Sequence, residues 1–267
     1  MKGLGSMVVA LFRPKRGFDG LAVGAKWLWL LPLALLIVSA MLKAGVSTPL
    51  VMKEQEAFIA EQMGQVTIDG ESAMASDEPA SSDSEKEKAR AEAEPGSPDV
   101  VVPDDQMATV SAIATTSAVV FGGIGAAVAV LFTAFFFFIA GKVAAKETRF
   151  GAFLTLASVA FVPHALRNLV QTLYMNATGI ALQHEGLGAL VAPADPAVAP
   201  PLSYALLSQI DIWVIWGLVI LAGGLVSALA GFDRKRAWTS FGAYVAIVAL
   251  LQAVPTIVSG AFMGMGM

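Results

Sequence analysis

Polar side chains with the capacity for chemistry gather at one place in an otherwise apolar stretch of the chain. Residues 150–175 include His164, Arg167, Asn168 and Gln171, whose spacings of i, i+3, i+4 and i+7 place them on one face of a helix. Such a face can bind an ion or a solute, with the imidazole titrating, or it can cross-link helices through hydrogen bonds. Because an arginine at the bilayer centre costs at least about 2.5–3.5 kcal/mol, we expect this face to point toward other helices.

The expected depth of Arg167 in the membrane narrows the choice of its partner. Arg167 follows Phe150 by 17 residues, or about 25 Å along a helix axis, which puts it near the outer boundary of the bilayer. The next apolar segment begins there, directly after Gln209 and Asp211, and Asp211 is the acidic residue that adjoins its start. An ion pair between Arg167 and Asp211 is therefore compatible with the expected depths of both residues.

Three interpretations of this polar group remain open. It forms a clamp between two helices, it belongs to the path of an ion or solute, or Arg167 extends to the headgroups without a protein partner. A path requires polar groups through most of the membrane depth, but residues 150–162 are apolar apart from Thr155 and Ser158. This distribution favours the clamp. Pro163 removes a backbone donor from the same helix and predicts a kink there.

Composition identifies the kind of protein in which this group lies. The 267 residues are 56% apolar and 14% charged, whereas soluble domains average about 25% charged residues. Cysteine is absent, which excludes disulfides, thiolate zinc sites and cysteine nucleophiles. The metal-binding, serine-nucleophile, phosphate-loop and dinucleotide motifs of common enzymes are absent as well. We therefore expect no enzyme, no cofactor, no metal site and no nucleic-acid partner.

The apolar residues form stretches long enough to cross a bilayer. A hydrocarbon core of about 30 Å needs about 20 apolar helical residues. The pattern predicts an all-α, multi-pass membrane protein with about five transmembrane helices, at residues 27–42, 110–141, 150–175, 210–231 and 237–261. The first stretch is short enough for a signal peptide. However, the basic segment before it is long for a signal peptide, and the residues that follow it match a cleavage site poorly, so an uncleaved helix is favoured.

The basic residues predict the orientation of these helices. Lys and Arg collect on the cytoplasmic side of membranes, and here they cluster within residues 1–26, 142–149 and 233–236. These three segments lie on one side of the predicted membrane. The N-terminus is therefore expected in the cytoplasm and the C-terminus outside, with external loops at residues 43–109 and 176–209.

The two charged segments at the start of the chain have different expected roles. Residues 43–109 contain 15 Asp and Glu against 5 Lys and Arg. Their low-complexity part, 70–105, is expected to be disordered, and it acts either as a solvated tether or in the capture of cations or basic proteins. Residues 49–65 are expected to continue the first helix along the membrane surface. The basic segment 1–26 is expected either to lie in the headgroup region as an interfacial helix or to serve only as a topology signal.

Three segments resemble bacterial members of the Yip family, the Ypt/Rab-interacting membrane proteins. Leu-Phe-Arg-Pro at 11–14, followed by Trp-Leu-Trp-Leu-Leu-Pro-Leu at 27–33, resembles the start of that family's first helix. Residues 151–163 resemble its third helix, with a proline late in the span. The strongest similarity is at 206–225, where Ile-Asp-Ile-Trp-Val-Ile-Trp-Gly-Leu resembles a family helix with an acidic residue and two aromatic residues at its start. The resemblance covers residues 11–42 and 110–261.

The resemblance implies a five-helix multi-pass protein in a bacterial cytoplasmic (inner) membrane. Eukaryotic relatives are linked to Rab GTPases, but this sequence lacks their long N-terminal region and their Asp-Leu-Tyr-Gly-Pro element, so binding of a small GTPase is not supported. We expect a non-enzymatic protein that acts through helix packing with lipids, partner membrane proteins or a second copy, in membrane organisation or a trafficking-like role. The alternative is a small ion or solute transporter that uses the polar face of residues 150–175.

Overall fold

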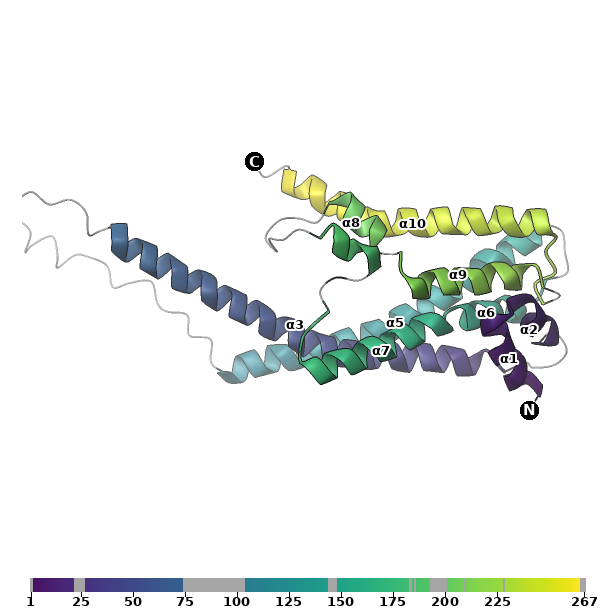
Figure 1. Cartoon of the computed structure of the whole chain (residues 1–267), viewed down its shortest axis with the longest axis horizontal. Coiled ribbons are helices and arrows are strands. Elements are labelled where there is room, and N and C mark those ends of the chain that lie inside the picture. The colour runs from purple at the N-terminus through teal and green to yellow at the C-terminus, as the bar shows by residue number, and fades with distance from the viewer. Residues whose placement is uncertain are drawn as a thin grey trace, which may run out of the picture.

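The computed structural model consists of helices and their connections in the part of the chain that it describes. That part comprises residues 2–21, 27–73, 104–143, 148–182, 184, 186–192, 201–208, 210–227 and 229–264. Its helices are α1 (Lys2–Phe12), α2 (Pro14–Leu21), α3 (Leu30–Ala73), α5 (Asp104–Val143), α6 (Phe150–Ala160), α7 (Val162–Thr178), the 3₁₀ helix η1 (Gly186–Leu190), α8 (Leu202–Leu207), α9 (Ile212–Leu225) and α10 (Arg234–Gly264). Figure 1 shows them as an elongated bundle, with α1 and α2 at one end.

Four apolar stretches of these helices are long enough to cross a membrane. They are Leu30–Ala57 of α3, Thr109–Val143 of α5, Phe150–Thr178 of α6 and α7, and Arg234–Val254 of α10. The predicted all-α membrane fold is therefore confirmed. The sidedness of the two termini stays a prediction.

The helix expected at 210–231 is shorter in the structure. Helix α9 has 14 residues, or about 21 Å, which is less than the thickness of a hydrocarbon core. The chain leaves the helix after Leu225 and turns through Gly231, whose φ of 67° is in the left-handed region that glycine adopts without strain. A turn at this point shortens α9 and brings the chain directly to the start of α10.

Helix α3 is longer than the predicted first transmembrane segment. It continues from Leu30 to Ala73, past residue 42, where the first transmembrane segment is expected to end, and into the first residues of the stretch 70–105 that is expected to be disordered. Residues 49–65 continue the helix as their pattern predicts, because Lys, Glu, Gln, Met and Ala favour helix in this stretch. Helix α5 likewise begins at Asp104. The rest of the predicted disordered loop, 74–103, lies outside the described residues.

Helices α3 and α5 lie side by side along much of their length (Figure 1). Their approach is close because α5 presents glycine to α3. A Cβ atom on Gly123 would lie 3.0 Å from Met41 Cγ, and one on Gly122 would lie 3.6 Å from the backbone oxygen of Ala40. Small residues at such a contact permit van der Waals packing between backbones, the main source of helix association in lipid.

Helices α6 and α7 form one bent unit around Phe161. Pro163 lies in the first turn of α7, where it removes one backbone donor and its ring displaces the carbonyl four residues earlier. The kink expected at Pro163 is therefore present as a break between two helices. The bend separates the apolar α6, which is expected to form the inner, cytoplasmic half of this segment, from the polar α7, which is expected to form the outer half.

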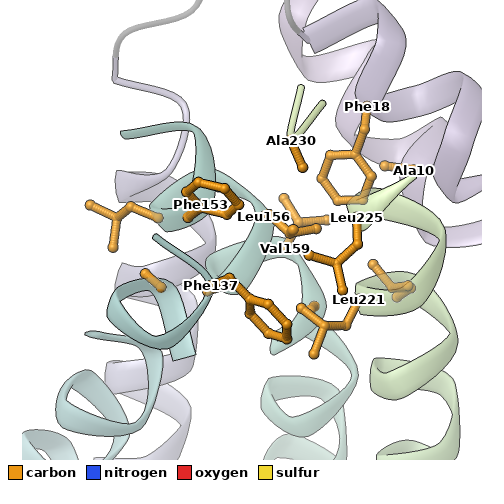
Figure 2. Close-up of a cluster of buried hydrophobic side chains, with 14 of the residues drawn as sticks. Ala10, Phe18, Phe137, Phe153, Leu156, Val159, Leu221, Leu225 and Ala230 are labelled. Atoms are coloured by element: carbon orange, nitrogen blue, oxygen red, sulfur yellow. The ribbon is translucent and has the colours of Figure 1, made fainter. Parts of the chain in front are cut away.

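The most deeply buried side chains lie where α6 meets its neighbours. Phe153, Leu156 and Val159 of α6 are each 1% exposed, and they pack beside Leu221 and Leu225 of α9 (Figure 2). Phe137 of α5 and Phe18 of α2 complete this cluster. The core therefore joins the bundle to the N-terminal helices as well as joining the long helices to each other.

Candidate functional site

The structure brings Arg167 of α7 and Asp211 together at the start of α9. Arg167 Nε lies 3.0 Å from Asp211 Oδ2. The other carboxylate oxygen, Oδ1, accepts a hydrogen bond of 2.7 Å from the backbone N–H of Val214. The two charged side chains are 13% and 11% exposed. One carboxylate thus neutralises a largely buried guanidinium and satisfies a donor at a helix N-terminus.

The backbone around Asp211 holds the carboxylate in this position. Asp211 has φ −138° and ψ 170°, the extended conformation of an N-cap residue. The preceding turn is fastened by the backbone N–H of Leu187, which donates to the Ile210 oxygen at 3.0 Å. Gly186 has φ 59°, and a Cβ there would lie 2.7 Å from the Ser208 oxygen. Helix η1 therefore packs on the turn that leads into α9 and limits its movement.

His164 lies one turn before Arg167 and faces the same helix. Its ring centroid is 5.1 Å from that of Phe161, and a Cβ on Gly217 would lie 3.5 Å from His164 Cε1. Its Nδ1 atom is buried without a hydrogen-bond partner among the described residues. The imidazole is therefore placed at the contact between α7 and α9, close to the ion pair.

The two amides of the predicted polar face are not brought into the ion pair. Asn168 is half-buried, and its backbone oxygen accepts a hydrogen bond of 2.7 Å from Thr172 Oγ1. Gln171 is half-buried as well, and its Oε1 atom has no hydrogen-bond partner among the described residues. Gln209, the other polar residue noted near Asp211, lies outside the described residues. The centre of the site is thus Arg167 and Asp211, with His164 beside it.

Two glycines bring α9 into backbone contact with α6. A Cβ on Gly217 would lie 2.8 Å from the backbone oxygen of Ala160. Seven residues further on, a Cβ on Gly224 would overlap Leu156 and lie 2.8 Å from Phe18 Cε2. The ion pair therefore stands at one end of a tightly packed interface.

A second polar contact between helices was not found from the sequence. Thr133 Oγ1 of α5 and Tyr244 Oη of α10 lie 2.8 Å apart and are buried. The Tyr244 ring lies 5.2 Å from that of Phe137 and 5.6 Å from that of Phe136. Polar residues in apolar helices are a general signal for helix contacts, but no spacing rule connects two residues that are 111 positions apart.

The polar groups of the inner half of this segment are bonded within their own helix. Thr155 Oγ1 donates to the Gly151 oxygen at 2.8 Å, and Ser158 Oγ donates to the Leu154 oxygen at 2.7 Å. These hydroxyls therefore do not extend the polar face of α7 toward the other side of the bundle. Among the described residues there is also no group of three or more His, Asp or Glu side chains that could hold a metal ion.

Comparisons with known proteins give one match. A family model described as the Yip1 domain matches residues 9–254. Neither the curated proteins nor the solved structures that were compared contain a match.

Proposed function

Because the chain belongs to the Yip1 domain family, whose model spans residues 9–254, we propose that this membrane protein is non-enzymatic and acts through helix packing with lipids or partner membrane proteins. Membrane organisation or a trafficking-like role follows from this mode of action. The basic clusters near residues 1–26, 142–149 and 233–236 support an orientation with the N-terminus in the cytoplasm, and the resemblance to bacterial members of the family is the reason for proposing a bacterial cytoplasmic membrane.

The observation that carries this proposal is the use of charged groups as structural links. Asp211 satisfies both Arg167 and the N-terminus of α9, so its two oxygens are engaged within the protein. Glycine-mediated contact between α9 and α6 extends from the same place. An arrangement of this kind fixes the relative position of helices, and a fixed helical surface is what lipids and partner membrane proteins recognise.

A transporter is the second candidate, and two unpartnered atoms favour it. His164 Nδ1 and Gln171 Oε1 are buried near the ion pair without hydrogen-bond partners among the described residues, and an ion or a small solute would satisfy them. Against this candidate stands the inner half of the segment, whose two hydroxyls bond to backbone oxygens of the same helix. A solute path would need polar groups at that depth as well.

Arg167→Ala separates the two candidates. In the clamp, this change leaves the Asp211 carboxylate largely buried without its counter-ion, at a cost of about 3 kcal/mol in the free energy of unfolding. The measurements are abundance in membranes and thermal unfolding of the purified protein. The double variant Arg167→Ala with Asp211→Asn is the rescue, because asparagine retains the N-cap oxygen and removes the unpaired charge.

The clamp is supported by a low abundance of the single variant and substantial recovery in the double variant. A transporter instead predicts normal abundance and unfolding in both variants, together with loss of uptake in a transport assay. That result would overturn the proposed role. Purification from native membranes, followed by identification of retained proteins and lipids, then tests whether partners bind the packed helices.

A further inference from the structure

The two N-terminal helices form a tight antiparallel hairpin with a groove between them. Glycines allow their close approach, since a Cβ on Gly17 would overlap Ala10 and one on Gly20 would lie 2.8 Å from Ser6 Oγ. The groove has a volume of about 500 Å³. Its lining consists mainly of small residues, with one hydroxyl and one guanidinium: Gly5, Ser6, Val9, Arg16, Gly17 and Gly20.

The hairpin is docked on the membrane-spanning bundle. Trp216 Nε1 of α9 donates a 2.8 Å hydrogen bond to the Leu11 oxygen at the end of α1, a carbonyl that the helix itself leaves without a partner. Phe18 of α2 is fully buried beside Gly224 of α9. A Cβ on Gly223, two residues before the end of α9, would lie 2.6 Å from Pro14 Cβ at the start of α2. The hairpin therefore contacts α9 close to its last residues, at one end of the bundle (Figure 1).

The outward face of α1 is apolar. Leu4, Val8 and Phe12 follow one another at intervals of four residues, and they are 53%, 54% and 72% exposed. Val9, which borders the groove, is 43% exposed. An exposed apolar strip on a helix that is held against a transmembrane bundle is suited to contact with acyl chains. The groove therefore opens beside a surface for lipid tails.

The charge beside the groove is positive. Arg13, Lys15 and Arg16 are exposed at the turn and on α2, whereas Asp19 is the acidic residue of the described segment 2–21. Arg16 lines the groove itself. A guanidinium binds a phosphate through two parallel hydrogen bonds, which gives such a contact both strength and a fixed geometry.

We propose that the groove between α1 and α2 is a binding site for the headgroup of an anionic phospholipid. Arg16 binds the phosphate, the Ser6 side of the groove receives the polar headgroup, and the acyl chains lie along Leu4, Val8 and Phe12. Gly17 and Gly20 let the two helices touch, whereas the Cβ position of Gly5 is open to the groove, so the space for the headgroup lies beside Gly5. The apolar strip next to the guanidinium is the reason for assigning a lipid to this site, because a soluble anion would not require it.

The test uses the full-length protein in detergent with added phosphatidylglycerol, and native mass spectrometry measures the fraction of protein that retains lipid. Arg16→Gln is expected to weaken phosphatidylglycerol binding about tenfold or more, the effect of removing a charge-assisted hydrogen bond to the phosphate. Gly5→Leu is expected to weaken it similarly without a change of charge. Gly5 lines the groove and a Cβ there has no neighbour within 4 Å, so a leucine side chain begins in open space and narrows the groove.

Lys15→Gln is the matched control, because Lys15 is an exposed base on the same helix but does not line the groove. Its affinity for phosphatidylglycerol should change less than twofold. Equal losses in Arg16→Gln and Lys15→Gln would overturn the proposal in favour of diffuse attraction. Equal binding of phosphatidylcholine, or displacement of the lipid by inorganic phosphate, would overturn it as well. None of these results depends on the role of Arg167 and Asp211.

Discussion

Helices α9 and α10 begin with the same chemistry in two different surroundings. Asp211 accepts a hydrogen bond from the Val214 N–H at 2.7 Å and pairs with Arg167 at 3.0 Å. Asp233 accepts one from the Arg236 N–H at 2.9 Å and pairs with the Arg236 side chain at 3.3 Å. The charged side chains are 13% and 11% exposed at α9, but 51% and 52% exposed at α10.

The difference shows that location decides what an Asp–Arg pair can do. Arg236 lies three residues after Asp233, so their pair shapes only the first turn of α10. Arg167 reaches Asp211 from another helix, so that pair also fixes α9 against α7. Solvent screens the exposed pair, which is worth about 0–1 kcal/mol. Removing one partner of a buried pair costs about 3–5 kcal/mol, because the other charge is left without compensation.

Helices α9 and α10 also differ in how closely they pack against their neighbours. Helix α9 has only 14 residues, yet Gly217 and Gly224 bring it into close contact with α6 and α2. Helix α10 has 31 residues, and it exposes Trp238, Leu250 and Leu251 among its large apolar side chains. Lipid tails are as apolar as leucine, so helix length alone provides no drive for association. Small residues and polar pairs secure the shorter helix.

The largest effect is expected from Asp211→Ala, with Asp233→Ala as its matched control. Asp211→Ala removes an N-cap and leaves Arg167 unpaired, so it should lower the free energy of unfolding by about 4 kcal/mol. Asp233→Ala removes an N-cap and an exposed pair, with an expected loss of about 1 kcal/mol. Unfolding of both variants in lipid bicelles measures the difference. Equal losses would show that burial does not distinguish the two helix starts.

A smaller effect is expected when the backbone contact of α9 is disturbed. A Cβ at position 217 would lie 2.8 Å from the Ala160 backbone oxygen, and a backbone atom cannot rotate away. Gly217→Ala should therefore lower the free energy of unfolding by about 2 kcal/mol. Gly125→Ala on α5 is the control, because nothing lies within 4 Å of its Cβ position and alanine favours helix. The idea of a tight α9–α6 contact fails if both variants unfold alike.

The smallest effect concerns the attachment of α10 to α5. Thr133→Val and Tyr244→Phe each remove one side of the 2.8 Å hydrogen bond between these helices. We expect a coupling energy of about 1 kcal/mol from the double-mutant cycle, the usual size for hydrogen bonds between transmembrane helices. Unfolding of the four proteins in the same bicelles measures it. A coupling energy near zero would leave the aromatic contacts of Tyr244 as the attachment of α10.

The sequence predicts that the chain is a membrane protein and that α7 has a polar face. Both features depend only on the order of residues within a single helix. Apolar length predicts a spanning segment, and the 3.6-residue period groups His164 with Arg167. Depth in the membrane makes a pair between Arg167 and Asp211 possible, because both residues are expected near the same boundary, but the sequence leaves open whether Arg167 pairs or extends to the headgroups. The apolar pattern also predicts a helix that starts at residue 210, and α9 begins at Ile212.

Contacts that depend on which helices are neighbours were decided by the tertiary structure alone. Hydropathy does not specify how an apolar helix is rotated about its axis, so it cannot connect Thr133 to Tyr244 or place Gly217 against Ala160. The docking of the N-terminal hairpin through Trp216 has the same origin. The sequence determined that this chain is a set of membrane helices and that one of them has a polar face. Packing in three dimensions determined which helices are joined by that polar face and which are joined by the glycines.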